Sequence, residues 1–273
     1  MRSLAASWGR LRRKASSYYY WGSFPWYRRL DINTTGFRIV KPEIVAELPH
    51  DPAVFTQGLA VDGDCLYESA GRYGSSKLRK LSLSGELEAE IAVPQGFAEG
   101  IAVSGHELVQ LTWREQLAIR YAKESLEPVG DWRYHGEGWG LASFGDGYIM
   151  SDGSHRLFER DAGFAIRRGV SVTWQGKPVY WLNDLEVVQG MVLANVWGAD
   201  FLLGVAYPAG TVSCIVDCSE LVARECPGHS SHVLNGVAYC PADETFFLTG
   251  KCWQAIYKVQ LPTLLTSAGT QSV

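Results

Sequence analysis

The chain has 273 residues, of which 47% are hydrophobic and 20% charged, and it is rich in glycine (29), tryptophan (10) and tyrosine (13). This composition is typical of a folded globular protein and argues against a mainly disordered chain. No apolar run approaches the roughly 20 residues of a membrane-spanning helix, so we expect no transmembrane segment. The formal net charge of −4 gives no reason to expect a nucleic-acid partner.

The charge is unevenly distributed along the chain. Residues 1–35 have seven basic side chains and one acidic side chain, so the remaining residues hold a net charge of −10. We therefore expect residues 1–37 to be a basic, aromatic-rich extension outside the main domain. Its aromatic cluster, from Tyr18 to Trp21, suits either a membrane interface or the surface of the domain, and we recognise no apolar secretory segment.

A short pattern recurs five times from residue 55 onward. Each copy has an apolar strand that begins near a polar or aromatic residue and usually a glycine, as in Phe55-Thr-Gln-Gly and Phe97-Ala-Glu-Gly. The aligned positions are 42, 40, 44 and 52 residues apart, and they are Gln57, Glu99, Trp139, Asn183 and Asn235. Repeats of about 40 residues are typical of the blades of a β-propeller.

The rest of each copy predicts further antiparallel strands. A Gly- or Asp-rich turn follows the first strand, and second and third short strands come after it. Earlier copies have a fourth strand, which the fifth copy lacks, but residues 43–48 can supply it from the N-terminal side. We therefore predict an all-β fold, a five-bladed β-propeller over residues 38–262 closed by an N-terminal strand, with a tail at 263–273.

A propeller brings equivalent positions of its blades to one face, around one axis. The ends of the second strands add a further set to the starts of the first strands: Glu68, Trp113, Asp152, Trp197 and Lys251. Aromatic walls with a few polar groups are typical of a small-molecule pocket. Glu99 is the one charged residue among the starts of the first strands, and Lys251 is the one cation among the ends of the second strands. We therefore expect these two residues to take part in the chemistry.

These residue types also have structural explanations. The repeated glycines suit close approach of backbones, and a propeller tryptophan can pack between blades instead of lining a pocket. Glu68 and Asp152 can bond the backbone at strand ends. The sequence leaves both explanations open for these residues.

Ten motifs in order resemble the plant and bacterial type of glutaminyl cyclase. The match covers roughly residues 45–259 and includes Tyr67-Glu-Ser-Ala-Gly, Gln110-Leu-Thr-Trp, Ala194-Asn-Val-Trp and Thr249-Gly-Lys. The resemblance implies a five-bladed propeller that cyclises N-terminal Gln of peptides or proteins to pyroglutamate and releases ammonia. It implies a catalytic Glu99 and a pocket made of Phe55, Gln57, Phe97, Trp113, Trp139, Asn183, Trp197 and Lys251. Asp184 and Gln254 stand where relatives usually have Glu and Pro.

This reaction needs little beyond proton transfer. The substrate α-amine must lose a proton before it attacks the γ-amide carbon, and the leaving ammonia must gain one. One carboxylate can do both, so we expect Glu99 to act first as base and then as acid, with a pKa raised by apolar neighbours. Lys251, Asn183 or Gln57 can stabilise the developing oxyanion, and no redox cofactor is required.

Metal and disulfide sites remain open at this stage. Cys214, Cys218, Cys226, His229 and His232 fit no standard zinc spacing, and a Cys218–Cys226 disulfide would need an oxidising compartment. The sequence allows a structural divalent cation in the channel near Asp184 or Glu186. We expect a monomer, and the resemblance allows a secreted, periplasmic or membrane-surface location.

Two other functions compete with the cyclase. A propeller that binds peptide N-termini without turnover needs no Glu99, and a metal-dependent lactonase-type propeller needs an inner ring of several carboxylates. The intact Glu99 and Lys251 favour the cyclase over the first alternative. The amide-rich inner ring disfavours the second.

Overall fold

The computed structural model describes residues 36–225, 231–262 and 264. Most of the predicted extension and tail therefore lies outside the described residues. The described chain is an all-β, propeller-like fold with one short helix, α2 (Ser219–Glu225). Among these residues, no helix has the length and apolar character needed to cross a membrane.

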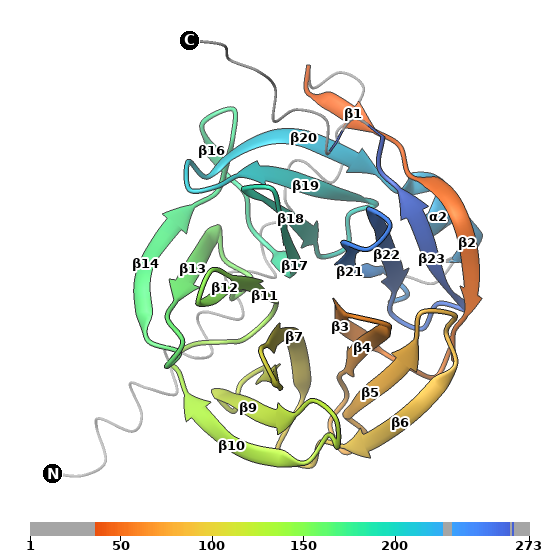
Figure 1. Cartoon of the computed structure of the whole chain (residues 1–273). Coiled ribbons are helices and arrows are strands. Elements are labelled where there is room, and N and C mark those ends of the chain that lie inside the picture. Colours follow the sequence, from red (N-terminus) through yellow and green to blue (C-terminus); the bar gives the residue numbers. More distant parts are fainter. Residues whose placement is uncertain (1–35, 226–230, 263, 265–273) are drawn as a thin grey trace, which may run out of the picture. The chain divides into compact units, whose positions relative to one another are not determined.

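Five sheets make up the fold and surround a common axis (Figure 1). Each begins with an inner strand, and four of them have four strands in antiparallel order. The first contains β3 (Thr56–Asp62), β4 (Cys65–Ala70), β5 (Lys77–Ser82) and β6 (Leu87–Ala92). The second contains β7 (Ala98–Ser104), β8 (Glu107–Thr112), β9 (Leu117–Ala122) and β10 (Pro128–Arg133).

The remaining three sheets follow in chain order. The third contains β11 (Leu141–Phe144), β12 (Gly147–Ser151), β13 (Arg156–Arg160) and β14 (Ile166–Ser171). The fourth has seven strands: β17 (Leu182–Val188), β18 (Met191–Val196), β19 (Phe201–Ala206), β20 (Thr211–Asp217), β15 (Thr173–Trp174), β16 (Lys177–Pro178) and β1 (Arg38–Val40). The fifth contains β21 (Leu234–Cys240), β22 (Thr245–Gly250), β23 (Ala255–Gln260) and β2 (Glu43–Pro49).

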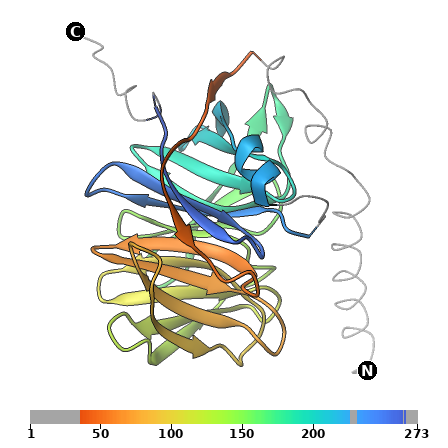
Figure 2. The ribbon, with the colours of Figure 1, turned by 90° about the vertical axis from the view of Figure 1, so that its right-hand side faces the viewer.

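The strand predicted near residue 43 is present and belongs to the last sheet. It is β2, which pairs antiparallel with β23, from Glu43 opposite Gln260 to Pro49 opposite Ala255. Figure 2 shows β2 beside β23 from the side. The N-terminal strand thus covers the edge that β23 would otherwise leave unpaired.

The innermost strands lie close together around the axis. They contact one another in the order β3, β7, β11, β17 and β21, and β21 contacts β3 again. A Cβ on Gly100 would lie 2.5 Å from the Leu141 nitrogen, and one on Gly140 would lie 1.9 Å from the Asn183 oxygen. The repeated glycines are therefore explained by close backbone approach, which was the structural alternative.

Neighbouring sheets are held together by apolar side chains between them. Tyr67 and Leu78 of the first sheet share one cluster with Ile101 and Leu108 of the second. Burial of each such side chain stabilises the fold by about 2 kcal/mol. Outer strands are more exposed, as the alternating burial of β6 and β10 shows, so the core lies toward the inner strands.

The structure also explains the longer repeat spacings. The hairpin β15–β16 lies between Trp139 and Asn183, and α2 lies between Asn183 and Asn235. Neither insertion has a counterpart in the other copies, so repeat comparison did not predict them. The parallel pairing of β1 with β20, from Arg38 opposite Cys214, was also not predicted.

Candidate active site

Glu99 lies at the start of inner strand β7 and is buried, with 5% of its surface exposed. Its Oε1 accepts a hydrogen bond from Nε2 of Gln57 on β3, at 3.0 Å. Burial raises the pKa of Glu99 well above the usual 4.5, and the charges of Glu137 and Asp184 add to this, although Lys251 opposes it. The carboxyl group therefore holds a proton more readily than an exposed glutamate does.

Lys251 follows β22 and is also buried. Its Nζ lies 4.8 Å from the ring centroid of Phe55, which is within cation–π distance. Burial lowers the pKa of Lys251 to about 8, while Glu99 acts in the opposite direction. Among the ion pairs of the described residues none joins Lys251 to Glu99, so the two charges interact at longer range.

Aromatic rings form a wall beside these two charges. Phe97, two residues before Glu99, packs against Phe55 at 6.4 Å and against Trp113 at 5.6 Å between ring centroids. Tyr73, from the connection between β4 and β5, packs on Phe97 at 5.3 Å and is 58% exposed. The wall thus runs from buried groups near Lys251 to an exposed rim.

Glu137 fixes two of the predicted tryptophans. Its Oε2 accepts hydrogen bonds from Nε1 of Trp113 at 2.9 Å and from Nε1 of Trp139 at 3.2 Å. Its Oε1 accepts a bond from Nε of Arg114 at 3.3 Å. One carboxylate therefore sets the orientation of both indoles.

The predicted amides lie on the inner strands, as expected. Asn183 on β17 and Asn235 on β21 are buried, and the Oδ1 atom of each has no hydrogen-bond partner among the described residues. Nδ2 of Asn235 donates to the backbone oxygen of Gln57 at 3.0 Å. Trp197 follows β18 and packs edge-on against Trp181, at 5.3 Å between ring centroids.

Two other rim candidates have structural roles. Glu68 is fully buried and accepts hydrogen bonds from His50, Thr56 and Arg79 side chains at 2.6–2.8 Å, not from the backbone. Asp152 accepts a bond from the Ser154 backbone nitrogen at 2.9 Å, as the backbone alternative predicted. Both carboxylates are thus occupied by neighbours within the fold.

Comparison with known proteins identifies the family of the chain. Residues 26–261 match the family of glutamine cyclotransferases. The chain belongs to the glutamine cyclotransferase family. The family inferred from the ten motifs, and with it an enzyme of the transferase class, is therefore confirmed.

Individual relatives support membership of the family. The chain is 35% identical over 239 residues to an Arabidopsis thaliana protein named glutaminyl-peptide cyclotransferase, covering 85% of this chain and 75% of the relative. It is similar to the crystal structure of Myxococcus xanthus glutaminyl cyclase, with a TM-score of 0.77 and 34% identity over 82% of this chain and 97% of the other. The WD40 repeats of RRP9 share only the fold, at 10% identity and a TM-score of 0.51 over 81% of this chain and 99% of theirs.

Metal ligands do not gather in the described part of this cyclotransferase-family chain. No group of three or more His, Cys, Asp or Glu there is placed to hold an ion. Near the channel, Oδ2 of Asp184 and both oxygens of Glu186 accept backbone hydrogen bonds, which leaves Oδ1 of Asp184 as a lone unpartnered oxygen. Cys218 is a free buried thiol, whereas Cys226 and His229 lie outside the described residues.

Sequence comparison of the repeats missed Glu137 and Tyr73. Glu137 stands two residues before Trp139, between two glycines, but the repeated pattern begins one residue after it. Tyr73 lies in a connection between strands, where the copies do not align. The one sequence signal for Glu137 was an acidic residue flanked by two glycines.

Proposed function

We propose that the chain is a glutaminyl-peptide cyclotransferase that converts the N-terminal Gln of peptides or proteins to pyroglutamate and releases ammonia. The observation that carries the proposal is Glu99, a buried carboxyl with a raised pKa that has one amide donor and, among the described residues, no ion-pair contact. A buried carboxyl that is not fixed by a cation can exchange a proton with a substrate. This is the property that the reaction requires.

Glu99 takes part in both halves of the reaction. As base, it accepts a proton from the substrate α-amine while the amine nitrogen forms a bond to the γ-amide carbon. As acid, it returns that proton to the amide nitrogen while the bond between this nitrogen and the carbon breaks. The products are the lactam ring and ammonia, and Glu99 ends in its starting state.

Other side chains bind and orient the substrate. The Lys251 ammonium stabilises the oxygen of the γ-amide as negative charge develops on it. The unpartnered Oδ1 of Asn183 accepts a hydrogen bond from a substrate N–H group. Gln57 orients Glu99, and the rings of Phe55, Phe97, Trp113, Trp139 and Trp197 fold the Gln side chain toward its own amine and exclude water.

We further propose that the five sheets are the five blades of one closed propeller, with β2 completing the last blade. The continuous contact of the five inner strands and the pairing of β2 with β23 support this assignment. The predicted domain, residues 38–262, begins with β1 and includes every described strand. The extension and the tail are not assigned to this domain.

Ring closure is intramolecular and involves only proton transfer, so we expect no cofactor. A structural divalent cation near Asp184 or Glu186 would find Asp184 Oδ1 as the carboxylate oxygen of that pair with no hydrogen-bond partner among the described residues. We expect the chain to act as a monomer on free peptide N-termini. Specificity for Gln follows from the need for an amide whose nitrogen can leave.

Purified protein incubated with a Gln-initiated peptide tests this function. We expect ammonia release and a peptide mass lower by one ammonia. Glu99→Gln should lower turnover roughly 100-fold to 10,000-fold, because it removes the proton acceptor. Glu88→Gln, an exposed side chain paired with Lys80, is the matched control and should leave turnover unchanged.

Two results would contradict the proposal. Unchanged turnover in Glu99→Gln would contradict the catalytic assignment while leaving the family intact. Peptide binding without any ammonia from the wild type would favour the alternative function, a propeller that binds peptide N-termini.

A further inference from the structure

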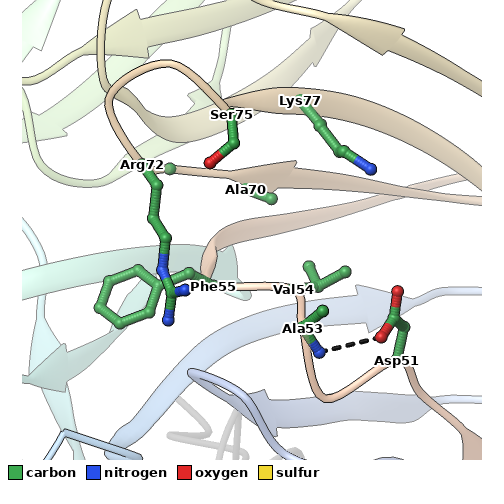
Figure 3. A pocket seen from close by; sticks show the side chains of 9 residues that line it. Asp51, Ala53, Val54, Phe55, Ala70, Arg72, Ser75 and Lys77 are labelled. Atoms are coloured by element: carbon green, nitrogen blue, oxygen red, sulfur yellow. Dashed lines mark hydrogen bonds between the residues drawn. The ribbon is translucent and has the colours of Figure 1, made fainter.

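A cavity lies beside Phe55, whose ring also contacts Lys251. It has a volume of about 290 Å³, and its charged or polar lining residues are Asp51, Arg72, Ser75 and Lys77 (Figure 3). The cavity is formed between the segment that precedes β3 and the connection between β4 and β5. Its volume suits a side chain or a short peptide segment rather than a large ligand.

Phe55 links this cavity to the candidate active site. The Arg72 guanidinium lies 4.9 Å from the Phe55 ring centroid, and Lys251 Nζ lies 4.8 Å from the same centroid. The two cationic groups are therefore about 10 Å apart at most. An extended peptide advances about 3.5 Å per residue, so the second or third residue after a bound N-terminal Gln reaches Arg72.

The connection that holds Arg72 is fixed in place. Ser76 is buried, its Oγ donates to the Arg72 oxygen at 2.8 Å, and the same Oγ accepts bonds from the nitrogens of Arg72 and Ala98. Ala98 immediately precedes Glu99. The hydrogen bonds thus tie the cavity wall directly to the strand that positions the proposed catalytic carboxyl.

The charges in the cavity are not equally available. Lys77 Nζ pairs with Glu90 at 2.5 Å, and Oδ1 of Asp51 accepts a bond from the Ala53 nitrogen at 2.9 Å. Arg72 donates to the Cys252 sulfur at 3.2 Å, and in the described part of the chain no carboxylate forms an ion pair with it. The guanidinium therefore has donors left for a carboxylate.

We infer that this cavity is a substrate subsite, and that it selects peptides with an acidic side chain two or three residues after the N-terminal Gln. Arg72 binds the carboxylate, and the Phe55 ring, which both Arg72 and Lys251 contact, joins this subsite to the proposed active site. The negative charge of Asp51 lies in the same cavity and repels a substrate carboxylate, so it weakens the preference for an acidic side chain. The inference rests on the proposed function, since the subsite is defined relative to the bound Gln.

Two peptides that differ in one residue test the subsite. We expect kcat/KM for Gln-Ala-Glu-Ala to exceed that for Gln-Ala-Lys-Ala roughly threefold to fivefold at low salt. The ratio is small because the ion pair between Arg72 and the substrate glutamate is partly exposed. The ratio should fall toward one as salt is added. Arg72→Glu should reverse the ratio, and Asp51→Asn, which keeps its oxygen acceptor, should increase it.

Arg167→Glu is the matched control, because it makes the same charge change at an exposed side chain of β14 paired with Asp146. It should leave the ratio as in the wild type. An equal kcat/KM for both peptides, or a ratio unaffected by Arg72→Glu, would overturn the subsite while the cyclase activity stands. Absence of ammonia from both peptides would contradict the proposed function instead. In that case calorimetry would still test the subsite, and equal affinities for the two peptides would overturn it.

Discussion

Two buried glutamates, Glu68 and Glu99, lie in adjacent sheets but have opposite pKa shifts. Burial alone would raise the pKa of Glu68, but His50 and Arg79 outweigh burial and lower it below the usual 4.5. Burial raises the pKa of Glu99 well above 4.5, and the distant charge of Lys251 does not offset it. The charges of His50 and Arg79 and the hydrogen bonds to Glu68, not burial, therefore distinguish the two carboxyl groups.

The difference separates a structural carboxylate from one suited to catalysis. Glu68 joins three elements, because His50 follows β2, Thr56 begins β3 and Arg79 lies on β5. His50 also bonds the Trp253 oxygen at 2.8 Å, which connects the first and last sheets. Glu99 has one amide partner, and its proton is free to move.

The largest expected effect on stability comes from Glu68→Gln. The change leaves the buried Arg79 without its nearest carboxylate, so we expect the free energy of unfolding to fall by about 3–5 kcal/mol. Denaturant unfolding at neutral pH measures this loss. Glu88→Gln, which breaks an exposed pair, should cost less than about 1 kcal/mol. An equal loss of unfolding free energy in Glu68→Gln and Glu88→Gln would show that the hydrogen bonds of Glu68 do not stabilise the fold more than an exposed ion pair does.

Lys251→Met should have the next largest effect. Removal of a donor to a developing oxyanion lowers kcat about 100-fold, or about 2.7 kcal/mol in activation free energy. The change should leave the fold intact, because the site is buried and Met is apolar. Lys258→Met is the control, because Lys258 lies on β23 and is paired with Asp243. A kcat unaffected by Lys251→Met would remove Lys251 from the mechanism.

The pH dependence of the wild type gives a separate test of Lys251. Its pKa is about 8, so the ammonium is lost as pH rises through this value, and kcat/KM should fall above about pH 8. The substrate amine loses its proton over the same range, which raises the rate, so the fall has to come from the enzyme. Lys251→Arg should abolish the fall, because a guanidinium stays charged. An alkaline fall that persists in Lys251→Arg would contradict the assignment.

Glu137→Gln should have a smaller effect, through Trp113 and Trp139. Both indoles donate to Oε2 and Arg114 to Oε1, so a Gln amide can accept from the indoles only as a neutral group and no longer accepts from Arg114. We therefore expect KM to rise about tenfold with a smaller change in kcat. Because the Glu137 charge raises the pKa of Glu99, its removal should also move the acid limb of the pH profile to lower pH. An unchanged KM and an unmoved acid limb would leave Glu137 with no role in the site.

The repeat pattern predicted much of this molecule. It located the inner strands, the strand that pairs with the last sheet, and the place of Glu99 at the start of an inner strand, because blade periodicity fixes which residues face the axis. It did not predict Glu137 or the Glu68 cluster. Glu68 bonds His50, which precedes the first copy, and Glu137 bonds Trp113 of the preceding copy. Such contacts depend on side-chain packing rather than on periodicity.

The same reasoning explains why the cavity beside Phe55 and Arg72 was not predicted. Its walls are two connections, one before β3 and one between β4 and β5, and connections vary in length and residue type between copies. Arg72 is one basic residue among many in the sequence. Only its position against Phe55 distinguishes it.

Direct measurement of the two carboxyl pKa values tests the central claim. Carbon-13 NMR titration of the Glu99 and Glu68 side-chain carboxyl groups, assigned with Glu99→Gln and Glu68→Gln, measures both in one protein. We expect Glu99 to titrate well above 4.5 and Glu68 below it. Titration of Glu99 at or below 4.5 would contradict its assignment as the group that accepts and returns the proton.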